Sequence, residues 1–333
     1  MLVDYHVHLE EGPYNSKWLQ RTLKALSSFD QNPYPQSSKQ AMEYNISLLM
    51  NRVKEGNYSE EWLDLYLQRA KDLRLKEVGI VDHLYRFHET RNYFEKAICV
   101  DENTALGKLQ KHWLDSVMTE EMGLFVACIE QAKVKWAKEG VQLKLGIEAD
   151  YFVGQEEELG EILEKYDWDY VIGSVHFVDG WGFDNPQTEE LFEQYDLKEL
   201  YTRFYETVEK MIQSKLFDFV AHLDNLKVFN RRVEDESFNR SWYERIAQNL
   251  VAANMATEIN AGLYYRYPVK ECCPAPSFLQ LLIDHQVPIT LSSDSHYPDD
   301  LGTCIEENAK TLMELGVNEV ATFERRKRIM KNL

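Results

Sequence analysis

Histidine and carboxylate side chains recur in this sequence at the points where short apolar runs end. His6 and His8 close the first run, and six of the nine histidines take this kind of position. Imidazole and carboxylate are the groups that bind Zn²⁺, Mn²⁺ and iron ions in proteins. The full set comprises His6, His8, His83, Glu148, His176, His222, Asp294 and His296. We therefore expect a metal site assembled from distant parts of the chain.

Eight ligands exceed the needs of one ion, because a catalytic zinc ion takes three protein ligands and keeps one position open. Two or three ions that share a bridging carboxylate would use the whole set. Taken singly, each histidine has the alternative of being an ordinary core or loop residue. The other three histidines, His88, His112 and His285, fall in predicted helices or loops. The contrast between the two groups favours a metal site.

Seven predicted strands carry these residues. Their β-formers and short length are typical of buried strands, and helical segments separate them. This alternation predicts a parallel sheet with right-handed crossovers, and in a barrel the carboxyl ends of the strands share one face. An open doubly wound sheet is the alternative. The predicted strands are residues 1–8, 77–81, 142–147, 169–175, 217–221, 256–259 and 287–293.

We predict one domain over residues 1–333, with a helical insertion around 27–73. Residues 84–103 are expected to form a long loop. The predicted helices cover residues 18–26, 40–54, 60–73, 106–139, 156–166, 189–215, 237–253 and 276–285, a segment after 303, and 323–331.

The composition limits the partners and the cellular location that this protein can have. The 37 basic and 56 acidic residues give a net charge of −19, which repels nucleic acid and anionic membranes. The five cysteines lack metal-finger spacing and are typical of reduced thiols. No signal peptide precedes the first strand, and no apolar run reaches membrane-spanning length. We expect a cytoplasmic protein with no nucleic-acid or membrane partner. The sequence does not decide its oligomeric state.

The order of these motifs resembles the polymerase and histidinol phosphatase (PHP) family. His-x-His lies on the first strand, Asp82-His83 follows the second, and a single Glu or His follows each of the next three. Asp294-x-His296 ends the seventh, so the match runs in order from Asp4 to His296. The resemblance implies an α/β fold, a distorted (β/α)₇ barrel. It also implies a two- or three-metal site at the carboxyl ends of the strands and hydrolysis of phosphoesters.

The resemblance also implies how the ligands are divided among divalent Zn, Mn or Fe ions. The first metal would take His6, His8, Glu148 and Asp294; the second Glu148, His176 and His222; the third His83 and His296. The family usually adds another third-metal ligand in the loop after His-x-His. That loop holds Glu10 and Glu11 here, and Glu11 is the candidate.

The segment Glu258-Ile-Asn-Ala-Gly-Leu-Tyr-Tyr-Arg266 resembles a Glu-x-Asn-Thr-x-Gly-Leu-Arg segment of histidinol-phosphate phosphatases, with Ala261 in place of Thr and two tyrosines inserted. The implied substrate is a small phosphomonoester, with L-histidinol phosphate the best candidate, which would place the protein in histidine biosynthesis. We expect Arg266 to contact the phosphate and Glu271 the substrate ammonium. Arg86 is the alternative phosphate contact.

Metal coordination lowers the pKa of bound water to about 7, so hydrolysis requires no side-chain nucleophile. Glu148 is the expected bridging ligand, and Asp294 and His222 are the candidates for moving a proton. Asp4 either orients a ligand histidine or is a buried structural acid. The alternative functions are a phosphoesterase of nucleotides or oligonucleotide ends and a non-catalytic metal-binding barrel. A metal-dependent amidohydrolase is more distant, although its barrels also open with His-x-His.

Overall fold

The computed structural model describes residues 1–10 and 12–333, and its centre is a sheet of seven parallel strands in the order β1-β2-β3-β4-β7-β8-β9. The strands are β1 (Val3–Val7), β2 (Glu77–Ile80), β3 (Gln142–Asp150), β4 (Tyr170–Ser174), β7 (Phe219–Val220), β8 (Ala256–Asn260) and β9 (Ile289–Ser292). The backbone N–H of His8 donates to the carbonyl of Ser295 at 2.7 Å, which joins the first strand to the end of the last. The sheet is therefore a nearly closed barrel, and the predicted (β/α)₇ architecture is confirmed.

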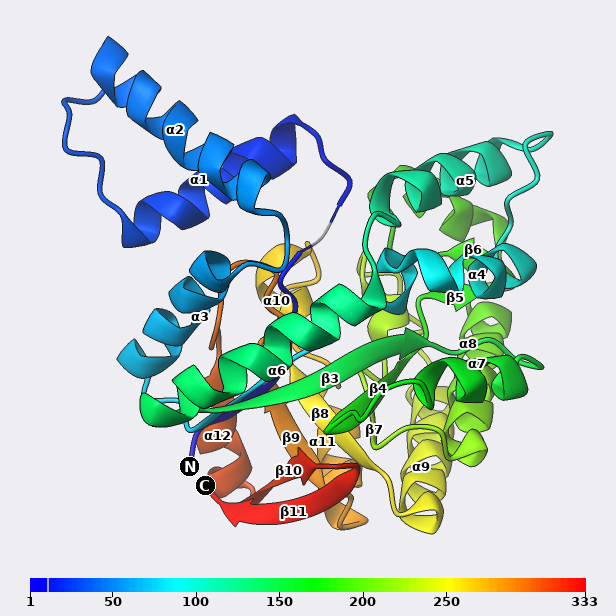
Figure 1. Ribbon diagram of the computed structural model, residues 1–333. Coiled ribbons are helices and arrows are strands. Elements are labelled where there is room, and N and C mark those ends of the chain that lie inside the picture. Colours follow the sequence, from blue (N-terminus) through cyan, green and yellow to red (C-terminus); the bar gives the residue numbers. More distant parts are fainter. Residues whose placement is uncertain (11) are drawn as a thin grey trace.

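Most of the helices lie around this barrel, and the first two helices of the chain project from it (Figure 1). They are α1 (Ser16–Phe29), α2 (Lys39–Glu55), α3 (Glu60–Asp72), α4 (Arg91–Ala97), α5 (Ala105–Val117), α6 (Met122–Lys138), α7 (Glu156–Leu163), α8 (Leu197–Ser214), α9 (Glu236–Ala253), α10 (Gly262–Arg266), α11 (Pro276–Asp284) and α12 (Ile305–Glu314). Short 3₁₀ turns are η1 (Leu84–Arg86), η2 (His88–Thr90), η3 (Pro186–Gln194) and η4 (Asn225–Lys227). Within the described part of the chain, no helix combines the length and the apolar character that a membrane crossing requires.

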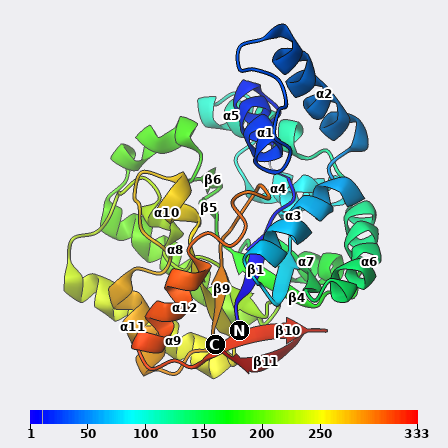
Figure 2. The same cartoon turned by 90° about the vertical axis from the view of Figure 1, so that its left-hand side faces the viewer.

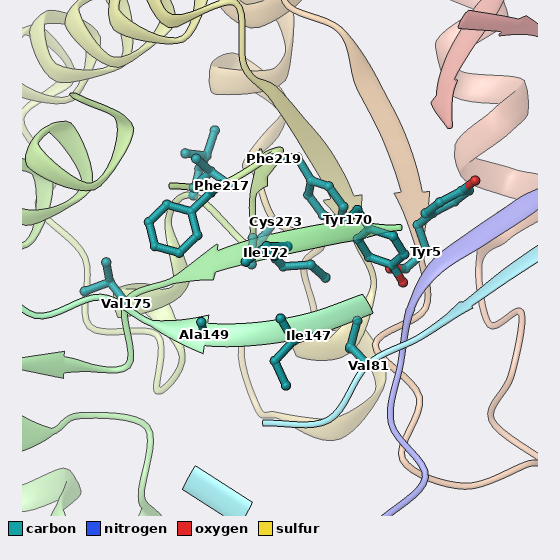
Figure 3. Close-up of a cluster of buried hydrophobic side chains, with 14 of the residues drawn as sticks. Tyr5, Val81, Ile147, Ala149, Tyr170, Ile172, Val175, Phe217, Phe219 and Cys273 are labelled. Atoms are coloured by element: carbon teal, nitrogen blue, oxygen red, sulfur yellow. The ribbon is translucent and has the colours of Figure 1, made fainter. Parts of the chain in front are cut away.

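Buried apolar side chains pack among the strands of the barrel, and Tyr5, Tyr170 and Phe219 contribute aromatic rings to this cluster (Figure 3). The ring of Tyr170 lies 5.2 Å from that of Tyr5 and 5.7 Å from that of Phe219, measured between centroids. Two glycines leave room for it, because a Cβ at Gly79 would lie 2.1 Å from the Tyr170 hydroxyl and one at Gly146 only 2.4 Å from Cζ. Such close packing at one end fixes the strands that carry the polar residues at the other.

The carboxyl end of the chain forms a β-hairpin, so the helix predicted over 323–331 is wrong. The strands β10 (Glu319–Glu324) and β11 (Lys327–Asn332) pair antiparallel. Arg325 and Arg326, with φ of +49° and +62°, close the two-residue turn, which is the backbone geometry of a tight hairpin. Phe323 points its ring onto Tyr5 and Phe219, at centroid distances of 5.6 and 5.2 Å, and covers that end of the barrel.

Three further segments differ from expectation. Residues 84–103 contain η1, η2 and α4, so that segment is not one long loop. Residues 106–139 form two helices, broken between Val117 and Met122. Residues 189–215 divide into η3 and α8, because Asp196 caps a new helix by accepting a hydrogen bond from the N–H of Glu199 at 3.1 Å. A hairpin of β5 (Phe177–Val178) and β6 (Trp181–Gly182) after His176 was not predicted.

The helices α1 and α2 form a hairpin that projects from the barrel (Figures 1 and 2). Glu10 connects it to the first strand by accepting hydrogen bonds from the indole of Trp18, at 2.6 Å, and from the guanidinium of Arg52. The next helix, α3, buries Trp62 and Tyr66 in the core. The projecting part is therefore the α1–α2 hairpin, and the single domain over residues 1–333 stays a prediction.

Candidate metal centre

All eight predicted ligands that the strand ends carry come together at the carboxyl end of the barrel. None is more than 7% exposed: His6, His8, His83, Glu148, His176, His222, Asp294 and His296. Side chains alternate along an extended chain, so His6 of β1 and His8, directly after β1, point to the same side. Glu148 lies on β3, and the remaining ligands lie two to four residues past the end of a strand.

Glu148 lies at the middle of the group. Its Oε2 is 2.7 Å from Nδ1 of His83 and 3.3 Å from Nε2 of His6. Its Oε1 faces the other way and lies 3.1 Å from Nε2 of His222 and 3.6 Å from Nε2 of His176. One carboxylate therefore faces two sets of imidazoles, which is the arrangement that a bridging ligand requires.

Asp294 and a stack of imidazoles make up the rest of the centre. Asp294 Oδ1 is 3.2 Å from Nε2 of His296 and 3.6 Å from Nε2 of His8. The His8 ring stacks against those of His83 and His296, at centroid distances of 4.2 and 4.3 Å, and the latter two rings lie 5.7 Å apart. Three groups have ligand atoms within 4.8 Å of one another: His8, His83 and His296; His6, His8 and Glu148; and His83, Glu148 and His176.

The donor atoms fit divalent metal ions. Four buried atoms at the centre make no hydrogen bond of acceptable geometry with the described residues: His6 Nε2, His8 Nε2, His83 Nδ1 and Glu148 Oε2. Leaving a buried polar atom unpaired costs about 1–3 kcal/mol. Four such atoms converging on one place are explained by cations that bind to them, and imidazole with carboxylate is a donor set that Zn²⁺ accepts.

Two carboxylates outside this set orient ligand histidines. Glu258 lies 3.1–3.2 Å from Nδ1 of His6, and Asp150 lies 2.8 Å from Nδ1 of His176. An ionised carboxylate only accepts hydrogen bonds, so Nδ1 of each ring must carry the proton and Nε2 must turn its lone pair toward the centre. Glu258 also accepts the backbone N–H of His222 at 3.0 Å. It therefore positions two ligands.

The electrostatics favour ionised carboxylates at Glu148 and Asp294 and a neutral imidazole at His8. At His6 and His176 the neighbouring carboxylates outweigh burial and raise the pKa, so a metal ion must displace a proton from these two rings. Burial alone would raise the pKa of Glu148, but His83, His6 and His176 outweigh it and hold that pKa well below its usual range. Burial likewise opposes ionisation of Asp294, yet Arg266 and His6 lower its pKa. For His8, burial and the neighbouring His83 both lower the pKa, so its imidazole is neutral.

Two of the ligands have unusual backbones. His222 has φ of +23° and Asp294 has φ of +54°, a region that residues other than glycine rarely occupy. Such conformations cost about 1–3 kcal/mol and persist where the surroundings enforce them. Asp4 helps to enforce the second, because its carboxylate accepts from the N–H and hydroxyl of Ser293 at 2.9 and 2.5 Å. These contacts favour the structural-acid interpretation of Asp4.

A cavity of about 200 Å³ opens onto the centre. Glu148, His176, His222, Asp294 and His296 lie at its floor. Its walls include Gly12, Pro13, Tyr85, Gln110, Trp113, Phe177, Asp184, Asn185, Gln187, Asn225, Leu263, Arg266 and Tyr267. The walls thus combine aromatic rings, amides, one arginine and one carboxylate that is not a predicted ligand.

The predicted substrate residues take different positions. Arg266 lines the cavity, with Nη2 2.9 Å from Asp294 Oδ2. Arg86 is fully buried outside the lining and donates to the carbonyl of Val117 and the hydroxyl of Tyr14, both at 2.9 Å. Glu271 also lies outside the lining, 2.7 Å from Lys227 Nζ and 3.0 Å from Arg232 Nη1. Only Arg266 among the three faces the cavity.

Of the two acidic residues after His-x-His, Glu10 turns away to Trp18 and Arg52, as described above. Glu11, the predicted third-metal ligand, lies outside the described residues, and its role stays a prediction.

Three carboxylates at this site were missed from the sequence. Glu258 and Asp150 carried a usable signal, because Glu258 opens the segment that resembles histidinol-phosphate phosphatases and Asp150 lies two residues after the candidate ligand Glu148. Asp184 carried no such signal, because it follows the β5–β6 hairpin, which was itself unpredicted. Burial raises its pKa, and His176, His83 and His222 oppose that shift.

Comparisons with known proteins agree with this geometry. The PHP domain model matches residues 57–262. A protein of Deinococcus radiodurans named "probable histidinol-phosphatase" is 34% identical over 218 residues, which cover 65% of this chain and 81% of that protein. A protein of the same name from Clostridium acetobutylicum is 26% identical and covers 75% of this chain and 97% of its own.

Among solved structures, histidinol phosphate phosphatase from Lactococcus lactis, in complex with zinc, L-histidinol and phosphate, has the same fold. Its TM-score is 0.65 at 16% identity, with 98% of both chains covered.

Proposed function

The chain belongs to the PHP domain family, and on that premise we propose that it is a metal-dependent phosphatase that hydrolyses L-histidinol phosphate to L-histidinol and phosphate. The observation that carries the proposal is Glu148, which lies between two sets of imidazoles and lines the cavity. The substrate in this proposal is taken from the names of the relatives, which are histidinol phosphatases. The eight clustered ligands speak against a non-catalytic barrel.

The eight clustered ligands would hold two or three divalent ions, with Glu11 as the remaining candidate for the third. When bound, such ions activate water at neutral pH and stabilise the charge on the phosphoryl group. Glu148 and Asp294 keep their charges inside a buried site, and Glu258 with Asp150 holds the imidazoles in the required tautomer. Asp294 or His222 would move the proton, since both face the floor of the cavity.

The walls divide into parts suited to the two ends of the substrate. Arg266 would contact the phosphoryl oxygens, because a guanidinium donates to two oxygens at once. Asp184 is the lining carboxylate outside the ligand set and would accept the substrate ammonium. The rings of Tyr85 and Trp113 lie 4.8 Å apart in the wall and offer an apolar face to the imidazole.

The identity of the metal as Zn, Mn or Fe, the number of ions and a cytoplasmic location are parts of this proposal. A chain with a net charge of −19 needs local positive charge to bind an anionic substrate, and the metal ions and Arg266 would supply it.

The test is kcat/KM of the metal-loaded protein on L-histidinol phosphate, an aryl phosphate and a nucleoside monophosphate. Arg266→Ala should lower kcat/KM on L-histidinol phosphate by roughly 30- to several-thousand-fold, because losing a buried charged contact costs about 2–5 kcal/mol. Arg203→Ala, which removes an exposed arginine paired with Asp179, should leave it unchanged. Metal content is measured alongside, since Arg266 also contacts Asp294.

Arg86→Ala separates the two arginines. Because its guanidinium bonds to Val117 and Tyr14, the variant should lose stability while the intact fraction keeps its preference among substrates. If L-histidinol phosphate proved no better a substrate than the aryl ester, the substrate assignment would be wrong and only a general phosphoesterase would remain.

A further inference from the structure

The outer face of α2 carries an apolar stripe that projects into solvent. Met42, Ile46, Met50 and Val53 are 61%, 47%, 66% and 61% exposed. At 3.6 residues per turn they fall within an arc of about 80° along the helix. The side of α2 that faces the protein buries Ala41 and Arg52, so the stripe points away from it. Four large apolar side chains in one line on a projecting helix mark an interaction surface.

The spacing of this stripe is symmetric about its own middle. Ile46 and Met50 lie equally far from the point between them, and Met42 and Val53 lie further out at nearly equal distances. A helix with this pattern can pack against a second copy of itself in the antiparallel direction, with Ile46 opposite Met50 and Met42 opposite Val53 of the other copy. Contacts of this kind are self-complementary and close under a two-fold axis.

Charges beside the stripe favour the same arrangement. Glu43 and Lys54 lie on one flank of it, about 100–120° around the helix from Met42. In an antiparallel pair, equivalent flanks meet, so Glu43 of each copy lies opposite Lys54 of the other. In a symmetric parallel pair the equivalent flanks lie on opposite sides of the contact, so neither Glu43 nor Lys54 would meet its counterpart or the other charge. Glu43 also lies 3.5 Å from Lys39 of its own helix, an exposed contact that a neighbouring lysine can share.

We propose that the α2 face formed by Met42, Ile46, Met50 and Val53 binds the same face of a second copy of this chain, antiparallel and about a two-fold axis. The contact lies on the projecting hairpin (Figures 1 and 2). A 17-residue helix is about 25 Å long, so a single helix pair buries less than the roughly 800 Å² per partner of a tight complex. The dimer should therefore be reversible and depend on concentration.

The experiment is sedimentation equilibrium of the metal-loaded full chain. The mass should rise from the 39.2 kDa of one chain toward twice that value as the concentration increases to the order of 1 mM. Met50→Glu should keep the protein monomeric, because it places a charge in the apolar contact. Val134→Glu is the matched control: Val134 is an equally exposed apolar residue, 63% exposed on α6, and this variant should dimerise as the native chain does.

A charge exchange tests the geometry. Glu43→Lys and Lys54→Glu should each weaken the dimer by about tenfold, since each turns both symmetric contacts from attraction to repulsion. The double variant should restore it. Glu43 and Lys54 are eleven residues apart on one helix, too far for contact within one chain. A dimer restored in the double variant must therefore depend on contacts between the two copies.

A native chain that stays monomeric throughout would overturn the proposal and assign the stripe to a different partner. A dimer that Met50→Glu leaves intact, or a charge exchange without restoration, would overturn it equally. Circular dichroism and metal content check that each variant is folded.

Discussion

At the scale of single residues, the metal centre depends on a carboxylate that touches no metal in our proposal. Glu258 is fully buried on β8. Its carboxylate accepts hydrogen bonds from Nδ1 of His6, from the backbone N–H of His222 and, at 2.8 Å, from the side-chain amide of Asn260. Each donor needs an acceptor at that point, because a buried donor without one costs about 1–3 kcal/mol. Glu258, on β8, thus connects β1 to the end of β7 through these hydrogen bonds.

Glu258→Gln should therefore weaken metal binding and activity by about 10–100-fold, because the amide offers one acceptor oxygen and turns an N–H₂ toward one of the donors. The readout is metal affinity by competition with a chelator, together with kcat/KM. His6 should then lose its fixed tautomer while the side-chain volume stays the same.

The matched control is Glu77→Gln, the same change at another buried glutamate. Glu77 lies at the start of β2, at the opposite end of the barrel, where it accepts from Tyr5 and Lys331. Glu77→Gln should lower the free energy of unfolding and leave the metal affinity unchanged. Equal metal affinities for the two variants would contradict the orienting role of Glu258.

What the sequence could reveal at this scale follows from spacing. Residues that end predicted strands share one face of a barrel, so eight ligands could be placed together before any coordinates were known. Arg86 shows the limit. It lies three residues past His83, but whether a loop side chain turns into the cavity or behind its wall depends on packing that spacing does not encode.

At the scale of elements, the barrel strands were predictable because parallel strands are buried on both faces and read as continuous apolar runs. The C-terminal hairpin was not, since Val320, Thr322 and Phe323 occur in a stretch of charged residues that also suits a helix. Tertiary context decided the matter: the Phe323 ring completes the aromatic cluster of the barrel, next to Tyr170 and Phe219.

Phe323→Ala should lower the free energy of unfolding by about 3–5 kcal/mol, the cost of emptying a buried aromatic site. Phe323 is 1% exposed. Urea denaturation measures the loss. Ile329→Ala on the partner strand, where the side chain is 42% exposed, should change stability by far less. A similar small loss for both would mean that the hairpin does not close the barrel. Both variants should keep the native metal content.

At the scale of the whole molecule, the chain carries a large excess of negative charge, and two buried carboxylates lie among six imidazoles at its active centre. Such a centre is costly without cations, because its unpaired atoms lie away from water and burial disfavours the charged carboxylates. Metal binding to the folded chain offsets this cost. The architecture was predictable from motif order, whereas the projecting hairpin with its apolar face had no counterpart in the ligand pattern.

Removing the metal should therefore lower the melting temperature. A ligand present at a thousand times its Kd adds about 4 kcal/mol to the stability of the native state, which corresponds to roughly 5–10 °C for a chain of this size. Differential scanning calorimetry with and without a chelator measures the shift, and adding Zn²⁺ or Mn²⁺ back should restore it.

The same material tests the number of ions. Elemental analysis of the reconstituted protein should find more than one equivalent per chain, because Glu148 faces two sets of imidazoles. Glu148→Gln should then lose more metal and more activity than any single histidine variant, since only this residue is placed to contact two ions. His83→Gln serves as the comparison, since His83 lies 2.7 Å from the same carboxylate but on one side of it. Full activity with one equivalent of metal, or near-native turnover of Glu148→Gln, would contradict the bridging role.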